Sequence, residues 1–277
     1  MRAALLQLNS SDDPGENLAT VRAGMERAAG EGAGFILTPE VTNCVSGSQT
    51  HRHAVLRHEG DDPVLAGLRD AAARLGVWLL IGSLALKTHD PDGRFANRSF
   101  LVSPAGEIVA RYDKIHMFDV EISETETYRE SRAFRPGTRA VVADTPFARL
   151  GLSVCYDVRF PYLYRALAKA GAEVLTVPAA FSPVTGAAHW ESLLRARAIE
   201  TGCYVLAPAQ CGTHKASRGQ PRQTWGHSMA VAPWGEVLVQ AGDAPGLHYV
   251  ELDRAEVDRA RRRVPALTHD RDFELPT

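Results

Sequence analysis

The chain has 277 residues, of which 45% are hydrophobic and 23% charged, and its formal net charge is -2 at pH 7. This size and composition suit one globular α/β domain that spans residues 1–277 around a large core. The nearly balanced charge gives no reason to expect nucleic acid or an anionic membrane as a partner. No apolar stretch approaches the roughly 20 residues that a membrane span requires.

Strand-like and helix-like stretches alternate along the chain, which is typical of a layered α/β fold. Residues 3–8 predict a first strand and are too short for a signal peptide. Further strands are expected at 35–40, 77–87, 98–103, 108–112, 148–154, 172–178, 203–209 and 248–252, with a hairpin at 229–239. Helices are expected at 17–29, 61–75, 162–170, 189–201 and 254–264. Residues 113–137 lack a clear period, and a loop this long in a compact domain is usually functional.

The four cysteines are too few and too scattered for a disulfide scaffold, which predicts reduced thiols in a cytoplasm. We expect Cys44, Cys203 and Cys211 to be structural. Cys155 differs because a strand-like apolar run ends at it and a helical pattern follows. A helix N-terminus and nearby cations lower the pKa of a thiol, so this position favours a nucleophile. The alternative is a small buried apolar side chain.

Two other predicted strand ends carry charged groups, Glu40 and Lys114. Side chains just beyond strand C-termini converge on one cleft in an α/β sheet. A carboxylate, an ammonium and a thiol suffice for acyl transfer, as proton acceptor, oxyanion partner and nucleophile. Taken separately, each charged residue is more typical of a solvated surface, so the prediction depends on the combination.

Four short motifs occur in a fixed order: TPE at 38–40, RYDKIHMFD at 111–119, YRES at 128–131 and CYDVRFP at 155–161. In order and spacing they resemble the motifs of the nitrilase superfamily of carbon–nitrogen hydrolases. The resemblance covers nearly the whole chain. It implies an α/β fold in the form of a four-layer αββα sandwich, two mixed sheets flanked by helices. It also implies a homodimer that works without cofactor or metal.

The resemblance assigns a role to five residues. Glu40 would act as general base and then as general acid, and Cys155 would form a thioester. Lys114 and the backbone N–H of Tyr156 would hold the oxyanion. Glu130 would orient Lys114 or the substrate.

Within the superfamily, several segments are similar to the Nit subgroup and most of all to deaminated glutathione amidases: 178–191, 194–200, 207–214 and 225–228. This implies hydrolysis of the amide that joins an α-ketoglutarate unit to Cys-Gly. An ω-amidase acting on α-ketoglutaramate and an N-carbamoyl amino acid amidohydrolase are alternatives with the same residues. A non-catalytic binding protein is a further alternative, but it need not keep Glu40, Lys114 and Cys155. Pro208 and Trp225 depart from the subgroup and fall where the pocket rim is expected.

An amide substrate that carries carboxylates needs a cationic anchor. Arg159, four residues after the expected nucleophile, is the best candidate for a bidentate contact, although an arginine at a helix start also pairs with surface acids. Phe181, Thr185 and Gln210 are weaker candidates for the pocket wall, and Phe181 fits equally well as a core aromatic residue.

Other features predict no further chemistry. His51 and His53 form a His-x-His pair, but no carboxylate or cysteine stands at a recognised metal-ligand spacing, so a surface loop is favoured over a metal site. Four arginines between 259 and 263 lie near the end of a predicted helix, where they complement its dipole.

Overall fold

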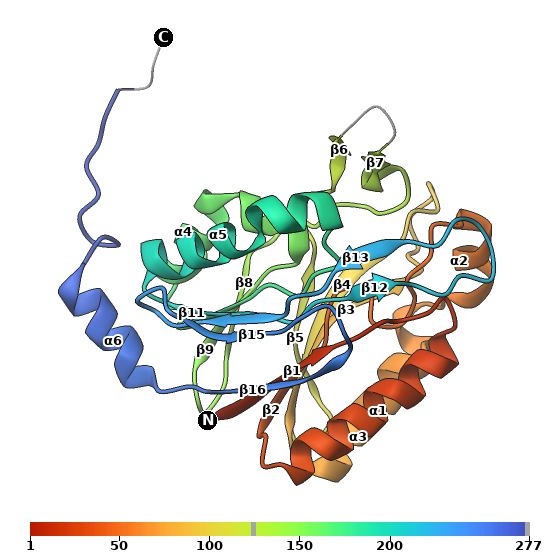
Figure 1. The fold of residues 1–277 in the computed structure, drawn as a ribbon, viewed down its shortest axis with the longest axis horizontal. Helices are drawn as coiled ribbons and strands as arrows, with labels where there is room; N and C mark the ends of the chain where they lie inside the picture. Colours follow the sequence, from red (N-terminus) through yellow and green to blue (C-terminus); the bar gives the residue numbers. More distant parts are fainter. Residues whose placement is uncertain (123–125, 275–277) are drawn as a thin grey trace.

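The computed structural model describes residues 1–122 and 126–274 and contains two mixed six-stranded sheets (Figure 1). The first sheet has the order β16 (Gly246–Glu251), β1 (Arg2–Gln7), β2 (Phe35–Leu37), β3 (Trp78–Leu86), β4 (Ala96–Val102) and β5 (Ile108–Asp113). The second has the order β15 (Val237–Gln240), β14 (Met229–Val231), β11 (Tyr204–Ala207), β10 (Val174–Thr176), β9 (Arg149–Leu152) and β8 (Val141–Asp144). Two small hairpins join β6 (Asp119–Glu121) to β7 (Thr127–Arg129) and β12 (Cys211–Thr213) to β13 (Gln223–Trp225).

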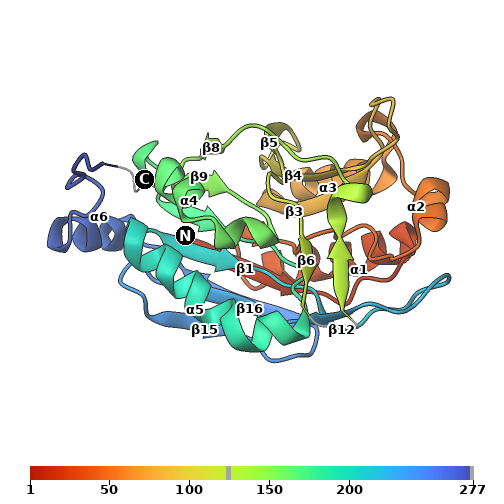
Figure 2. The ribbon, with the colours of Figure 1, turned by 90° about the horizontal axis from the view of Figure 1, so that it is seen from above.

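Helices cover the outer faces of both sheets (Figures 1 and 2). The pair α1 (Pro14–Gly30) and α3 (Pro63–Leu75) lies on the first sheet, and the pair α4 (Pro161–Lys169) and α5 (Pro183–Thr201) lies on the second. Two further helices, α2 (Gln49–Val55) and α6 (Arg254–Arg263), lie at opposite ends of the molecule. The predicted four-layer αββα sandwich is therefore confirmed.

Strand β1 shows how the sequence builds these layers. Side chains alternate across a strand, and both faces of β1 are apolar. Ala3 and Leu5 belong to the core between the sheets, while Ala4 and Leu6 belong to the core under α1 and α3. A fully apolar strand buried on both faces is what a four-layer sandwich requires.

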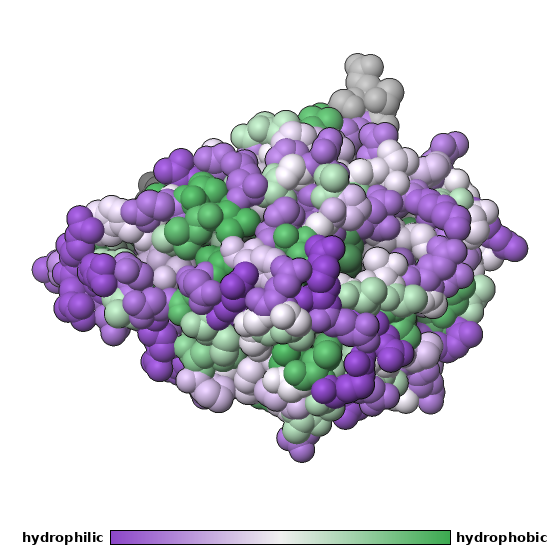
Figure 3. All heavy atoms as spheres, turned by 60° about the horizontal axis from the view of Figure 1, so that its bottom comes forward, coloured by the Kyte–Doolittle hydropathy of each residue, from purple (hydrophilic) through white to green (hydrophobic). Residues whose placement is uncertain are grey.

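Hydrophilic side chains predominate on the surface, and apolar ones form separate patches on the face that Figure 3 shows. Within residues 1–122 and 126–274, no helix has the length and apolar character needed to cross a membrane.

The structure differs from the predicted elements in several places, and it adds the strands β8, β12 and β13, which were not predicted. Helix α5 begins at Pro183 rather than at 189, because its first turns follow Ser182 as N-cap and lack the apolar period of the later ones. Helix α2 was not predicted, since none of its residues is buried and it has no apolar stripe to recognise. The expected loop 113–137 contains the hairpin β6–β7.

Gly82 lies in β3 between segments that follow a strand of each sheet, Thr38 after β2 and Pro178 after β10. A Cβ at this position would lie 1.8 Å from the carbonyl oxygen of Thr38 and 2.4 Å from Cβ of Pro178. No other residue type fits there without a shift of the backbone. Thr38 leads into Glu40, and the Pro178 carbonyl accepts the N–H of Cys155 at 2.9 Å. Gly82 therefore sets the distance between two of the predicted catalytic segments.

Candidate active site

Three strand ends meet at one cavity of about 680 Å³. Glu40 lies beyond the end of β2, Lys114 directly follows β5, and Cys155 follows β9 as the first residue of the short 3-10 helix η3 (Cys155–Arg159). Their exposed fractions are 3%, 2% and 7%, and all three line the cavity together with Glu130. The structure thus brings together the four side chains expected to carry the chemistry.

Lys114 joins the two carboxylates. Its Nζ donates to Oε1 of Glu40 at 2.9 Å and to the two carboxylate oxygens of Glu130 at 2.8 and 3.0 Å. Glu130 also accepts the backbone N–H of Phe118 at 2.7 Å, which fixes its orientation. Burial alone would lower the pKa of Lys114, but the charges of Glu130 and Glu40 outweigh it and raise the pKa. Lys114 therefore stays protonated.

Glu40 is held on every side. It accepts Nδ2 of Asn97 at 2.8 Å and the backbone N–H of Ala180 at 2.9 Å, and it lines the same cavity as Cys155. Burial would raise the pKa of Glu40, but the positive charges of Lys114 and Arg222 outweigh it and lower the pKa. Glu40 is consequently an ionised carboxylate that shares a cavity with a thiol, which suits a general base.

Cys155 has a left-handed backbone with φ of 50°, a conformation that costs free energy in a residue other than glycine and is often found at functional sites. Burial raises the pKa of its thiol well above the ordinary 9.0, the charge of Glu40 raises it further, and Lys114 only partly offsets both. The sequence position favoured a thiolate. The structure instead gives a neutral thiol, because burial and the neighbouring carboxylate dominate.

Asp157 connects the lysine segment to the nucleophile segment. This fully buried carboxylate accepts the Tyr112 hydroxyl at 2.6 Å and the Val154 N–H at 2.9 Å on one oxygen. Its other oxygen accepts the His116 N–H at 3.0 Å and contacts Nδ1 of the same residue at 2.7 Å. The residues on either side of Lys114 are thereby fixed relative to the turn that carries Cys155.

Phe181 and Thr185, two of the predicted substrate-binding residues, line the cavity, as does the side chain of Tyr156. The Thr185 hydroxyl is buried and has no hydrogen-bond partner among the described residues. The predicted oxyanion contact from the Tyr156 N–H remains a prediction.

The structure does not bring the other two predicted substrate-binding residues to the cavity wall. Gln210 is fully buried and donates to Oγ of Ser10 at 2.9 Å and to the backbone oxygen of Glu40 at 3.1 Å. It therefore holds the backbone of Glu40 without lining the cavity. Arg159 contacts Nδ1 of His189 at 3.2 Å, and its guanidinium lies over the ring of Phe181 at 5.5 Å.

Comparison with known proteins identifies this arrangement. The family model described as carbon-nitrogen hydrolase matches residues 2–262. The chain belongs to this family, in the nitrilase superfamily. The hydrolase is 43% identical over 269 residues to the deaminated glutathione amidase of Yersinia enterocolitica, covering 97% of this chain and 92% of that protein.

Solved structures agree. The hydrolase superposes with a TM-score of 0.89 on the NitFhit protein of C. elegans, at 36% identity, covering 98% of this chain and 65% of that one. It superposes with a TM-score of 0.77 on a mutant amidase from Nesterenkonia sp. AN1 that carries acrylamide on its active-site cysteine, at 29% identity and covering 96% of this chain and 98% of that one. The chain is thus an enzyme, a carbon–nitrogen hydrolase related to amidases.

Three residues at the hydrolase's cavity escaped prediction from sequence: Asn97, Arg52 and Arg222. Asn97 is a buried polar residue in β4, but Arg98 and Ser99 follow it directly, so the sequence pattern did not single it out. Arg52 lies in α2, which has no apolar face, and Arg222 lies in the aperiodic stretch before β13. Neither arginine carries a local signal, because tertiary contacts alone bring these segments to the cavity.

The departures at Pro208 and Trp225 do not line the cavity. Trp225 packs closely on Gly186 of α5 and stacks on His227 at 4.1 Å between ring centroids. These positions therefore affect the packing behind the cavity wall rather than the wall itself.

No group of three His, Cys, Asp or Glu side chains within the described ranges is arranged to hold a metal ion. His51 contacts the backbone oxygen of Asp12 at 2.8 Å, whereas His53 packs on Phe95, so the two histidines have separate partners. All four cysteines are free and buried.

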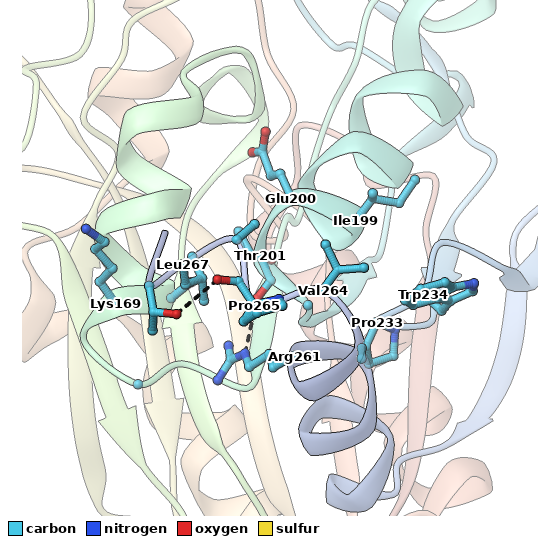
Figure 4. Close-up of a pocket in the computed structure, with 16 residues that line it drawn as sticks. Lys169, Ile199, Glu200, Thr201, Pro233, Trp234, Arg261, Val264, Pro265 and Leu267 are labelled. Carbon is cyan, nitrogen blue, oxygen red and sulfur yellow. Dashed lines mark hydrogen bonds between the residues drawn. The ribbon is translucent and has the colours of Figure 1, made fainter. Parts of the chain in front are cut away.

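A second cavity of about 650 Å³ lies between the ends of α4 and α5, helix α6 and the segment that follows it (Figure 4). Its charged side chains already have partners: Arg261 donates to the backbone oxygens of Thr201 and Ala172, and Lys169 contacts Asp270. The catalytic groups line the other cavity, so this second cavity has no part in the chemistry.

Proposed function

We propose that this hydrolase cleaves deaminated glutathione into α-ketoglutarate and Cys-Gly, a metabolite-repair reaction that uses no cofactor or metal. The observation that carries the proposal is that Glu40 and Lys114, which are hydrogen-bonded to each other, line one cavity of about 680 Å³ together with Cys155. That volume lies in the range of clefts that hold small molecules. The choice of substrate is supported by the relatives named deaminated glutathione amidase.

The proposed reaction has two halves. The thiol of Cys155 passes its proton to Glu40 while sulfur attacks the amide carbonyl, and Glu40 then gives that proton to the leaving nitrogen as the C–N bond breaks. The resulting thioester is attacked by water, whose proton goes to Glu40 and then returns to sulfur as the C–S bond breaks.

We assign oxyanion stabilisation to Lys114 and the Tyr156 N–H. Lys114 has three N–H donors, and its Nζ contacts one oxygen of Glu40 and both oxygens of Glu130. In the proposed reaction the oxyanion that develops on the substrate takes over the longer contact to Glu130, at 3.0 Å, while the other Glu130 oxygen still holds the ammonium. Glu130 acts on the reaction by holding the ammonium in place.

A substrate panel tests the proposal. We expect purified hydrolase to release Cys-Gly from deaminated glutathione with a kcat/KM well above those for α-ketoglutaramate, an N-carbamoyl amino acid and a simple nitrile. Preference for α-ketoglutaramate would instead identify an ω-amidase, and preference for the carbamoyl compound an N-carbamoyl amidohydrolase. Intact mass after acid quenching should show an acyl adduct on the wild type and none on Cys155→Ala. A folded Cys155→Ala variant that still turns over would remove Cys155 from the mechanism.

We further propose that the hydrolase is a cytoplasmic homodimer. Its four free, buried thiols suit a reducing compartment. Three apolar side chains around the second cavity are exposed, Ile199 at 57%, Trp234 at 43% and Val264 at 56% (Figure 4). A cluster of this kind is typical of a surface that a partner covers, and a second copy is the commonest partner of a soluble enzyme.

A further inference from the structure

Two arginines on the wall of the catalytic cavity have no ionic partner among the residues that the structure describes. Arg52 and Arg222 both line the cavity, and neither forms an ion pair with any carboxylate among the described residues. The third arginine on the wall, Arg129, differs because it is paired with Glu121. A half-buried guanidinium without a counter-ion is unfavourable, so this cavity is prepared for a negatively charged ligand.

None of the described carboxylates on the same wall forms an ion pair with Arg52 or Arg222. Glu40 and Glu130 are both engaged by Lys114. Glu126 accepts the hydroxyls of Ser182 at 2.8 Å and Tyr128 at 2.9 Å. No described carboxylate therefore takes up the N–H donors of Arg52 and Arg222, which remain available to a ligand in the cavity.

Arg222 lies next to the reacting groups. Its Nη2 donates to the backbone oxygen of Ala180 at 2.7 Å, and the N–H of that same residue holds the Glu40 carboxylate at 2.9 Å. Ala180 therefore links the two groups by hydrogen bonds: its carbonyl oxygen accepts from Arg222, and its N–H donates to Glu40. Its charge is also felt at Glu40, where it helps to lower the pKa of the carboxyl.

Arg52 belongs to the N-terminal half of the chain, whereas Arg222 belongs to the C-terminal half, and both line the cavity. It donates from Nη1 to the backbone oxygen of Ser46 at 2.8 Å, and its Nε is buried with no partner among the described residues. The rings of Phe134 and Phe95 lie against its guanidinium at 5.4 and 5.8 Å. Burial lowers the pKa of Arg52, and the positive charge of Arg222 contributes to the lowering, so the two guanidinium groups are close enough to repel each other.

A shared support holds the two arginine segments together. Asp12 accepts the N–H and the hydroxyl of Ser217, both at 2.7 Å, and its backbone oxygen contacts His51 at 2.8 Å. His51 directly precedes Arg52, and Ser217 lies five residues before Arg222. The pair is therefore positioned before any ligand arrives.

We propose that Arg52 and Arg222 form a carboxylate-binding subsite that holds the keto-acid end of the acyl group during hydrolysis. This rests on the proposed function. In an α-ketoglutaryl thioester the free carboxylate lies four C–C bonds from the acyl carbon, roughly 5 Å when extended. That reach fits an anchor beside Ala180, next to the catalytic carboxylate, and two guanidinium groups match the planar geometry of a carboxylate.

Calorimetric titration of α-ketoglutarate onto the intact hydrolase tests the subsite without relying on turnover. We expect Arg222→Met and Arg52→Met each to raise Kd about tenfold or more, as for loss of a charge-assisted contact. Arg129→Met is the matched control, because it removes a charge from the same wall that is already paired, and its Kd should stay within about twofold of the wild type. Circular dichroism of each variant checks the fold.

Several outcomes would overturn the subsite: no binding of α-ketoglutarate to the wild type, an unchanged Kd in both arginine variants, or an equal loss in Arg129→Met. A loss in Arg159→Met alone would assign the anchor to the residue that the sequence favoured. A failure of the proposed function would give a different result. In that case the wild type would not hydrolyse deaminated glutathione, while its affinity for α-ketoglutarate would still depend on Arg52 and Arg222.

Discussion

Cys155 and Glu40 divide one proton between them, and their surroundings decide where it resides. Burial and the carboxylate raise the pKa of the thiol, while Lys114 and Arg222 lower the pKa of the carboxyl. The resting pair is therefore a thiol and a carboxylate. The nucleophile is generated only when a carbonyl is present to accept it, which protects the cysteine from oxidation and alkylation between turnovers.

Removing the charge of Glu40 should shift the Cys155 pKa in one direction, and removing the charge of Lys114 should shift it in the other. Glu40→Gln deletes a negative charge that raises this pKa, so the thiolate should form at lower pH than in the wild type. Lys114→Ala deletes the positive charge that lowers it, so the thiolate should form at higher pH. Both variants should lose about 100-fold or more in kcat, because a base or an oxyanion donor is gone.

Ultraviolet absorbance of the thiolate across a pH titration measures these shifts, with Cys155→Ala as the blank. Shifts in the same direction, or a loss of only a few fold in kcat at either position, would contradict the assigned roles.

At the scale of elements, the site depends on how closely the segments that follow β2 and β10 approach the middle of β3. Gly82 in β3 lies between Thr38, which leads to Glu40, and Pro178, which holds the N–H of Cys155. The backbone oxygen of Thr38 cannot move aside in the way that a flexible side chain can. The separation of base and nucleophile is thus fixed by a single missing Cβ.

Gly82→Ala should therefore reduce both stability and activity. We expect a loss of about 1–3 kcal/mol or more in the free energy of unfolding from overpacking, together with a fall in kcat/KM, measured by denaturant titration and by Cys-Gly release. Gly30→Ala is the control, because a Cβ there meets no atom within 4 Å, and its effect should stay within about 0.5 kcal/mol. Wild-type stability and activity in Gly82→Ala would show that the sheets tolerate a wider spacing.

Elements with a strong period, and the groups at their ends, could be predicted from sequence. The layered α/β fold and the strand ends that carry Glu40, Lys114 and Cys155 belong to this class, whereas the αββα form followed from the resemblance to the nitrilase superfamily. Arg52 and Arg222 on the cavity wall could not be predicted, since α2 has no apolar stripe and the stretch before β13 has no period. Contacts of Asp12 with residues far away in the sequence place both segments. Gln210 lies off the cavity wall for a related reason: a polar residue in a buried stretch signals a hydrogen-bond network but not which side of the network faces the cavity.

At the scale of the molecule, helix α5 links the catalytic cavity to the exposed apolar cluster. Its first turn supplies Thr185 to the cavity wall, and its last turn carries Ile199 in the cluster with Trp234 and Val264. A partner that covers this cluster would restrain the helix that also borders the substrate. Assembly and activity are therefore expected to change together.

Ile199→Glu tests this connection, because it places a charge in the centre of the proposed dimer surface. Light scattering coupled to gel filtration should give about twice the 30.1 kDa chain mass for the wild type and the single-chain mass for the variant, with a parallel fall in kcat/KM. Val109→Glu is the matched control, since Val109 is an apolar residue with a comparable 45% exposure in β5 and outside the cluster. A monomeric wild type would refute the dimer. A variant that dissociates yet keeps full activity would show that α5 is rigid without its partner.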